Sequence, residues 1–318
     1  MNRPPVLIAG AGPAGMAAAL CCHELGLKVV VVDPEPPGGI LRASRWPVSF
    51  VLGGFHRTGL ETAERMARHL EQEKIPLLAD AVTGLDVAGK KALLEESGPL
   101  PYAACIVATG VRFRRSGLPG EAEAEGKWLF PHPALTPEAK GAGQRVIVLG
   151  GGDNAFSTAH VEAQAGARVT VIVRDDHIKA HSKTFLDAAA LPNIAVRTGW
   201  KAVRFGCLPS PHIDFSTPEG EIALPCDLAY ACLGYAPNSE PFAALKRDEE
   251  GWIGVDGEFR TSAPGVWAVG EVTGPKVPRI QTVLGHAPVA ALSIEKALRD
   301  EEALRKALEA MKTRGTGT

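Results

Sequence analysis

Short apolar runs that end at glycine recur along the chain and set its organisation. The first run, 6–9, leads into Gly10 and then into an Ala-rich segment, Met16–Leu25, which we expect to be a helix. A second run, Val29–Val32, ends in Asp33. Four-residue apolar runs bounded by turn residues are typical of buried parallel strands, and the intervening segment fits a crossover helix. The order predicts a strand–helix–strand unit.

The glycines of this unit have the G-x-G-x-x-G spacing of a dinucleotide site, with Pro13 and Ala14 between the last two. Gly10 permits the tight turn, Gly12 lets a diphosphate approach the backbone, and Gly15 lets the helix pack closely on the strand. The helix N-terminus offers free N–H groups and partial positive charge to the phosphates. Asp33 lies 23 residues after Gly10, where a carboxylate accepts hydrogen bonds from a ribose diol.

The same pattern returns in the middle of the chain. An apolar run over 145–149 leads into Gly150, Gly152 and Ala155, followed by a predicted helix over 156–165 and a strand over 169–173. Two such units indicate two nucleotide sites. The alternative is that one unit is a scaffold that no longer binds a nucleotide.

The two units differ at the residue that reads the ribose. Val173 stands at the offset that Asp33 has in the first unit, and Arg174 follows it directly. A missing acid beside a cation favours a 2′-phosphate, so we expect the second unit to prefer NADPH to NADH. The acidic pair 175–176 opposes this preference by repulsion. Further basic residues follow at Lys179 and Lys183.

The rest of the chain supplies supporting elements. We expect an amphipathic helix over Thr58–Gln72, strands within Leu77–Glu95, a buried strand at Ala104–Val107, linkers at 112–120 and 234–238, a strand ending at Gly270-Glu271, and a helical tail over Ala290–Met311.

Length and charge narrow the class of protein. A chain of 318 residues suggests two domains. With 34 basic and 36 acidic residues there is no basic excess for nucleic acid or a membrane surface, and no apolar run could span a bilayer. The first strand begins too early to leave room for a signal peptide, so we expect a cytoplasmic protein. Six scattered cysteines have no zinc-type spacing, and we predict no metal site.

Six motifs together resemble the two-dinucleotide-domain flavoprotein reductases, in particular the thioredoxin-reductase-like group. Besides the two glycine motifs they are 37–41, 108–110, 234–238 and 264–271. The resemblance implies an α/β fold with two Rossmann-like three-layer dinucleotide-binding domains, the second inserted into the first. The FAD-binding domain would be 1–114 with 243–318, and the NAD(P)-binding domain would be 115–242.

The resemblance also implies binding residues. For FAD they would be Gly10, Gly12, Pro13, Ala14, Gly15, Asp33, Gly39, Ile40, Leu41, Val82, Thr109, Gly110, Gly270 and Glu271. For the pyridine nucleotide they would be Gly150, Gly152, Asp153, Asn154, Arg174 and Lys179. The chemistry would be that of the flavin, without a catalytic side chain.

The chain departs from thioredoxin reductases in lacking their dithiol. The region before the second glycine motif reads 130-FPHPALT-136, and no cysteine occurs between Cys105 and Cys207. No pair follows the 37–39 turn either, where the glutathione-reductase-like branch has one. We therefore expect no thioredoxin reductase activity. The remaining cysteines are expected to pack in the core, namely the neighbours Cys21 and Cys22, and Cys226 with Cys232.

A group of ferredoxin–NADP reductases shares the architecture and also lacks the dithiol. The stretches 275–285 and 46–55 are similar to their flavin-proximal segments. Three positions differ from the family pattern: Glu271 replaces an Asp, Ile40 replaces a Gln, and 174–179 retains one Arg and a Lys.

The sequence thus leads to a FAD-dependent NAD(P)H oxidoreductase that passes electrons from nicotinamide through flavin to an acceptor. The acceptor would be a ferredoxin- or flavodoxin-like protein or a small molecule such as a quinone. Two alternatives stay open: a FAD protein reduced by a protein donor, and a non-catalytic nucleotide-binding sensor. His132 and His286 are interpreted as structural or surface histidines. The resemblance implies a homodimer.

Overall fold

The chain folds into two compact units and crosses from one to the other twice. The computed structural model describes residues 3–43, 48, 51, 57–132 and 142–315. Unit 1 comprises 1–112 and 236–318, and unit 2 comprises 113–235. The sequence-based boundaries, 114/115 and 242/243, differ most at the second crossing, where the structure has a strand, β17 (Tyr235–Pro237).

Unit 1 is built on a five-stranded parallel sheet in the order β18-β7-β1-β2-β3. Val6 pairs with Val29 on one side and with Ala104 on the other. The same unit contains a three-stranded antiparallel sheet, β4-β5-β6. The strands are β1 (Val6–Ala9), β2 (Val29–Val32), β3 (Leu77–Leu78), β4 (Val82–Asp86), β5 (Lys91–Leu94), β6 (Gly98–Pro101), β7 (Ala104–Val107) and β18 (Val266–Ala268).

Alternate residues of β1 face two different layers. Val6 and Ile8 pack in one core cluster with the helices α1 (Pro13–Glu24) and α6 (Ile280–Gly315). Leu7 and Ala9 face the opposite cluster, which includes residues of β5. Because successive side chains of a strand point to opposite faces, both faces of the apolar strand β1 are covered, which gives the three layers that the family resemblance implies.

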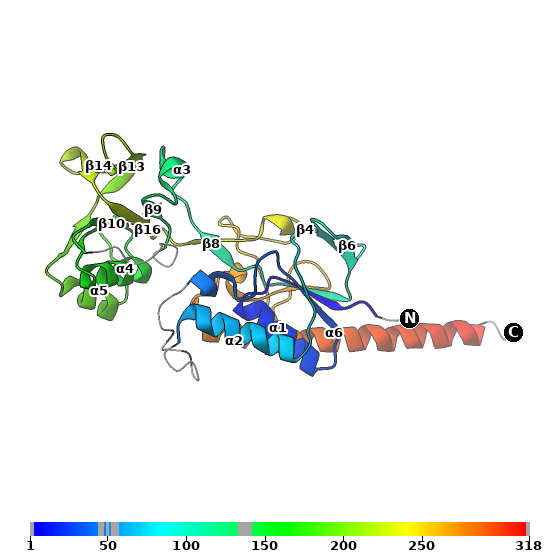
Figure 1. Cartoon of the computed structure of the whole chain (residues 1–318). Helices are drawn as coiled ribbons and strands as arrows, with labels where there is room; N and C mark the ends of the chain where they lie inside the picture. The colour runs from blue at the N-terminus through cyan, green and yellow to red at the C-terminus, as the bar shows by residue number, and fades with distance from the viewer. Residues whose placement is uncertain (1–2, 44–47, 49–50, 52–56, 133–141, 316–318) are drawn as a thin grey trace. The chain divides into compact units, whose positions relative to one another are not determined.

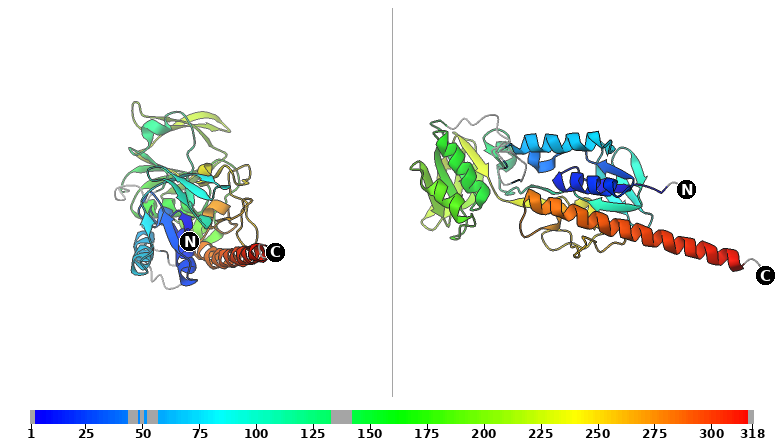
Figure 2. Two further views of the ribbon diagram at one scale, coloured as in Figure 1. Left: turned by 90° about the vertical axis from the view of Figure 1, so that its right-hand side faces the viewer. Right: turned by 90° about the horizontal axis from the view of Figure 1, so that it is seen from below.

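Helices α1 and α6 run side by side, and the C-terminal part of α6 extends past the sheet (Figures 1 and 2). Helix α2 (Gly59–Gln72) matches the predicted range. Contacts in its first turn explain why it begins at Gly59. Thr58 Oγ1 accepts from the Glu61 N–H at 3.2 Å, and the Glu61 carboxylate accepts from the Thr58 N–H at 2.8 Å. This capping box satisfies two N-terminal N–H groups.

Unit 2 repeats the plan with the parallel order β12-β11-β10-β16-β9. Alternate residues of β10 pack against α4 and α5 on one face and against the antiparallel sheet β13-β14-β15 on the other. The elements are α3 (Glu121–Ala124), β9 (Leu129–Phe130), β10 (Arg145–Leu149), α4 (Asp153–Gln164), β11 (Arg168–Val173), α5 (Ser182–Ala189), β12 (Ile194–Thr198), β13 (Lys201–Gly206), β14 (His212–Thr217), β15 (Gly220–Pro225) and β16 (Leu228–Ala231).

Several element boundaries differ from the predictions. Helix α1 begins at Pro13 rather than Met16, because extended Gly12 serves as its N-cap and proline suits the first helical position. The predicted linkers are wrong in part, since β8 (Val111–Phe113) and β17 are short strands that pair. The tail helix begins at Ile280, ten residues before the predicted Ala290. Within the described ranges, no helix is both long and apolar enough to cross a membrane.

Candidate functional site

Each position of the first motif requires glycine for a different reason. Gly10 has φ +107°, and a Cβ there would lie 2.4 Å from the Ala108 carbonyl oxygen. A Cβ on Gly15 would lie 2.0 Å from the Gly10 oxygen. Gly12, in contrast, has open space where its Cβ would be. Gly10 and Gly15 therefore permit the local fold, whereas Gly12 keeps the N-terminus of α1 accessible to a ligand.

Asp33 directly follows β2 and holds the glycine loop by a hydrogen bond. Its Oδ2 accepts from the Ala11 N–H at 2.6 Å, and its Oδ1 accepts from the Glu35 N–H at 2.9 Å. Burial raises the pKa of Asp33, and these two hydrogen bonds oppose the shift. Each oxygen retains a lone pair, so the carboxylate is still able to accept from a ligand hydroxyl.

A cavity of about 460 Å³ opens in unit 1 beside this loop. Every residue expected to contact FAD lines it except Gly15, which packs under the loop. The Gly39 turn adjoins the loop, because a Cβ on Gly39 would lie 3.2 Å from Gly12 Cα. Further lining residues were not among the predicted FAD contacts: Ala9, Val32, Pro34, Glu35, Ala81, Ala108, Val111, Asn238, Glu240, Pro241, Ile280 and Val283.

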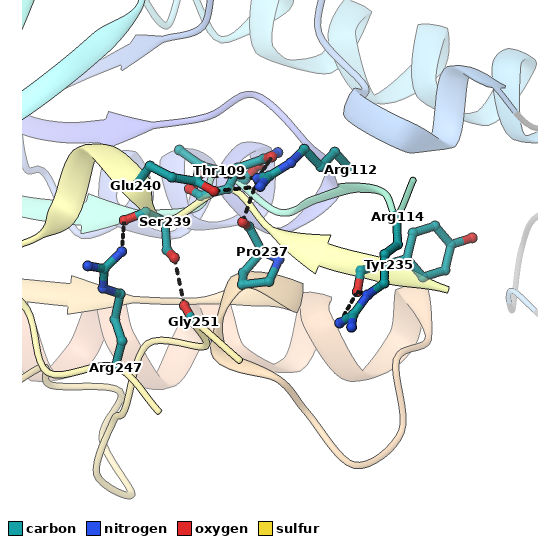
Figure 3. Close-up of polar contacts among 10 residues, drawn as sticks. Thr109, Arg112, Arg114, Tyr235, Pro237, Ser239, Glu240, Arg247 and Gly251 are labelled. Atoms are coloured by element: carbon teal, nitrogen blue, oxygen red, sulfur yellow. Dashed lines mark hydrogen bonds and ion pairs between the residues drawn. The ribbon is translucent and has the colours of Figure 1, made fainter. Parts of the chain in front are cut away.

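Two of the motifs meet at the rim of this cavity (Figure 3). Thr109 Oγ1 donates to the Asn238 carbonyl at 2.7 Å, and Asn238 Nδ2 donates to the Thr109 carbonyl at 2.9 Å. Arg112 donates to the Pro237 carbonyl at 2.8 Å and to the Glu240 carboxylate at 2.5 Å. The arginine holds the pKa of Glu240 below its usual range. The network fixes segments far apart in sequence against the cavity.

Two of the three positions that differ from the family pattern, Glu271 and Ile40, line the same cavity. Glu271 lines it, and no hydrogen bond to its carboxylate occurs among the described residues. Burial raises the pKa of Glu271. Ile40, on the 3-10 helix Gly39–Ala43, gives the cavity an apolar wall. The cavity thus combines apolar walls with a few carboxylates, as small-molecule sites do.

The second glycine motif in unit 2 has the same steric logic. Gly150 has φ +137°, and a Cβ there would lie 2.4 Å from the Cys232 carbonyl oxygen. Gly152 is sterically open and precedes α4, which begins at Asp153. Asp153 accepts from the His181 N–H at 2.8 Å, and Asn154 Nδ2 donates to the Tyr235 hydroxyl at 2.9 Å. The predicted residues thus surround one helix N-terminus.

The segment after β11 folds back on this motif. The N–H groups of Lys179 and Ala180 donate to the Gly151 carbonyl at 2.8 and 3.0 Å. Arg174 is exposed, and its Nε lies 3.5 Å from Asp175 Oδ1. The Lys179 backbone is therefore part of the loop, while the one arginine expected to read a 2′-phosphate has a competing carboxylate beside it.

Comparison with known proteins places this arrangement in a family. Over residues 4–293 the chain matches the pyridine nucleotide-disulphide oxidoreductases. The chain belongs to this family. As a member it is a flavin-dependent oxidoreductase, and the predicted resemblance and the two-domain Rossmann-like fold are confirmed.

Individual members of the family include proteins with different reactions. The chain is 31% identical to a ferredoxin–NADP reductase of Thermus thermophilus, covering 91% of both chains. It is 27% identical to the thioredoxin reductase of Bacillus subtilis, covering 96% of this chain and 98% of the relative. The crystal structure of Lactococcus lactis thioredoxin reductase superposes with a TM-score of 0.86 at 26% identity, covering 94% of this chain and all of that one.

The cysteines of this family member are not joined in disulfides. All six are free thiols, and the sequence contains no Cys-x-x-Cys. Cys22, Cys105 and Cys226 are buried, and burial raises the pKa of each thiol to about 12. Thiols held in the protonated form are poor nucleophiles. The predicted packing role is confirmed for Cys22 and Cys226, while Cys21 and Cys232 are half-buried.

The two singled-out histidines have structural contacts. His132 stacks on Phe113 with ring centroids 5.4 Å apart, and burial lowers its pKa to about 4. His286 stacks on Phe259 and accepts a backbone hydrogen bond. Residues 133–136, in the region of the missing dithiol, and most of the 46–55 stretch lie outside the described residues. No cluster of metal-ligating side chains occurs in the part of the chain that the structure describes.

Proposed function

We propose that unit 1 holds FAD, that unit 2 holds NAD(P)H, and that electrons leave the flavin directly for an acceptor without a dithiol relay. The observation that carries the proposal is the unit 1 cavity, which is lined by residues from four separate FAD-associated motifs. The absence of a Cys-x-x-Cys from the sequence supports the direct route.

The residues of the cavity fit FAD. The open backbone at Gly12 and the N-terminus of α1 offer N–H groups to a diphosphate. Asp33 would accept from the adenosine ribose, and the unpartnered Glu271 carboxylate would accept from the ribityl chain. Ile40 and Val283 would exclude water from the flavin. Bound FAD supplies hydride acceptance and the release of electrons singly or in pairs.

The acceptor that we favour is a ferredoxin- or flavodoxin-like protein, with a quinone-like small molecule as the alternative. The 31% identity to a ferredoxin–NADP reductase supports this choice. Thioredoxin reductase activity is not expected, because attack on a disulfide needs a thiolate that can exchange with it. The homodimer and the cytoplasmic location implied by the sequence stay predictions.

The first experiment is an anaerobic visible spectrum of the FAD-reconstituted protein before and after NADPH or NADH. We expect bound flavin absorbance that the coenzyme bleaches, and dye-acceptor turnover on the order of 1 s⁻¹ or faster. With thioredoxin disulfide as the acceptor we expect no turnover above the protein-free control. A protein that stays colourless after reconstitution would contradict the proposal.

A second candidate function is a FAD protein whose flavin is reduced by a protein donor. The contact between Arg174 and Asp175 favours it, because the carboxylate partly neutralises the cation expected to bind a 2′-phosphate. Failure of both coenzymes to bleach bound flavin, with dye-driven oxidation of pre-reduced flavin intact, would select this candidate. Absence of any turnover would instead select the non-catalytic sensor.

Arg174→Ala tests the coenzyme preference. If Arg174 binds a 2′-phosphate, the dissociation constant for NADPH should rise about fivefold, since an exposed ion pair contributes up to about 1 kcal/mol. The constant for NADH should not change. Lys183→Ala is the matched control, because Lys183 is an exposed cation already paired with Asp187 at 2.6 Å. Calorimetry that shows equal losses for both coenzymes would assign Arg174 another role.

A further inference from the structure

His286 contacts the backbone of the turn that carries Glu271. Its Nδ1 accepts from the Gly270 N–H at 3.1 Å. His286 lies on α6 one turn beyond Val283, and both Val283 and Ile280 line the cavity. The sequence suggested only a structural or surface role, because nothing in the local pattern shows that this side chain reaches residue 270.

Other contacts besides the one to His286 also hold the Gly270–Thr273 turn in place. Gly270 has φ +81°, and a Cβ there would lie 2.7 Å from the Ala14 Cβ, so the turn packs on the first turn of α1. Thr273 Oγ1 donates to the Gly270 carbonyl at 2.8 Å, and the Gly274 N–H donates to the Glu271 carbonyl at 3.0 Å. Gly270 is buried, and His286 accepts the hydrogen bond of its N–H.

The imidazole ring is itself held in place. Phe259 stacks on it with centroids 4.3 Å apart and an interplanar angle of 29°. The Phe259 carbonyl accepts from the Ala268 N–H at 3.0 Å, and Asp256 Oδ1 accepts from the flanking N–H groups of Glu258 and Arg260 at 2.8 and 2.9 Å. The ring is thus fixed between α6 and a loop anchored to β18.

We propose that His286 is a positioning residue for the flavin site: its Nδ1 lone pair holds the Gly270–Glu271 turn so that the Glu271 carboxylate faces the cavity. The inference rests on the proposed binding of FAD in unit 1. Because Nδ1 accepts, the bonded ring is neutral and carries its proton on Nε2. Protonation of Nδ1 removes the acceptor and leaves the buried Gly270 N–H opposite another donor.

The bond therefore makes FAD affinity fall at acid pH. Burial lowers the pKa of His286, so the neutral form dominates near neutral pH. Helix α1, which packs on α6, carries titratable side chains only in its last four residues, Cys21, Cys22, His23 and Glu24. The titratable and charged side chains on the neighbouring elements are Glu271 on the turn, Asp256, Glu258 and Arg260 on the Phe259 loop, Arg279 directly before α6, and Glu295 further along α6. Glu271 also titrates, so its contribution must be separated.

Two substitutions at one position make that separation. In His286→Asn the amide oxygen can take the place of Nδ1 and accepts without titrating, whereas His286→Phe keeps the stacked ring and has no acceptor. His69→Phe, at an exposed position in the last turn of α2, is the matched control. FAD binding to the full-length apoprotein is measured by flavin fluorescence quenching from about pH 5 to pH 8. Gly270 amide exchange is measured in the same apoproteins, and circular dichroism checks folding.

We expect His286→Phe to raise the FAD dissociation constant about tenfold at neutral pH and to speed Gly270 exchange. His286→Asn and His69→Phe should stay within about twofold of the wild type. The wild type should lose affinity toward acid pH more steeply than His286→Asn, whose remaining slope reports Glu271.

If the wild type binds FAD and both His286 variants match it in affinity and pH profile, this inference is overturned while the proposed function stands. If His286→Phe does not fold, coincident pH profiles for the wild type and His286→Asn overturn it. If the wild type binds no FAD, the proposed function falls, and the inference with it.

Discussion

Replacing Gly15 with alanine is expected to disrupt unit 1 and abolish FAD binding together. The added Cβ would lie 2.0 Å from the Gly10 carbonyl oxygen and 3.2 Å from the Ala108 Cβ. Both neighbours belong to the buried junction of β1, α1 and β7, so neither can move without displacing the glycine loop. Overpacking of this kind costs about 3 kcal/mol. Thermal unfolding followed by circular dichroism, together with the flavin content of the purified protein, measures both losses.

Gly12→Ala is the matched control, because it adds the same methyl group to the same motif. Its Cβ would meet nothing within 4 Å, and its φ of −70° suits alanine. The variant should therefore unfold near the wild-type temperature yet bind FAD more weakly, since the methyl group occupies the approach to the N-terminus of α1. Equal stability of Gly15→Ala and Gly12→Ala would show that the loop tolerates a side chain at position 15.

These contrasts show why the glycine motifs could be found from the sequence. Spacing along a strand–turn–helix is local, so Gly10, Gly12 and Gly15 have fixed geometric roles once the elements form. Most of the FAD-associated positions were named by the family resemblance, and they line one cavity because the carboxyl ends of adjacent parallel strands meet at one edge of a sheet.

Other features of the site depend on contacts that span the chain. Thr109 and Asn238 bond across 129 positions, and Arg112 meets Glu240 from a segment interpreted as a linker. Short strands such as β8 and β17 carry too few residues to show a period. The bond from Gly270 to His286 depends on the position at which α6 begins, which the sequence placed ten residues too late. Tertiary packing fixes all of these features.

The same limit applies to a buried acid in unit 2. Glu162 lies on α4 and is 2% exposed. Its Oε1 accepts from the Tyr230 hydroxyl at 2.7 Å, and its Oε2 has no hydrogen-bond partner among the described residues. On the sequence Glu162 reads as an ordinary polar helix residue. In the fold it is a buried carboxyl group, and within the described part of the chain only one of its two oxygens accepts a hydrogen bond, from Tyr230 on β16.

Burial makes Glu162 a source of pH-dependent instability. Desolvation raises its pKa above the ordinary 4.5, and the bond from Tyr230 opposes the shift in part. Because the folded state binds the proton more tightly than the unfolded state, the contribution of Glu162 to stability is full below the unfolded pKa and is lost as the pH rises through the folded pKa. Unit 2 should therefore lose stability on going from acid to neutral pH through this group.

Tyr230→Phe should amplify that loss, because it removes the donor to a buried carboxylate. We expect a cost of about 2 kcal/mol at neutral pH and a smaller one at acid pH, where the carboxyl group is neutral. Glu162→Gln should gain about 1 kcal/mol at neutral pH for each unit by which the folded pKa is raised, and should flatten the pH profile. Amide exchange of β10 and β16 reports unit 2 alone, which matters in a chain of two units.

The double variant, Glu162→Met with Tyr230→Phe, decides whether the penalty belongs to the pair. Removing both polar partners should cost less than Tyr230→Phe alone, since no unpartnered charge is left in the core. A Tyr230→Phe cost that is the same at acid and neutral pH would mean that Glu162 stays protonated throughout. In that case the hydrogen bond joins two neutral groups, and α4 carries its buried acid without an electrostatic cost.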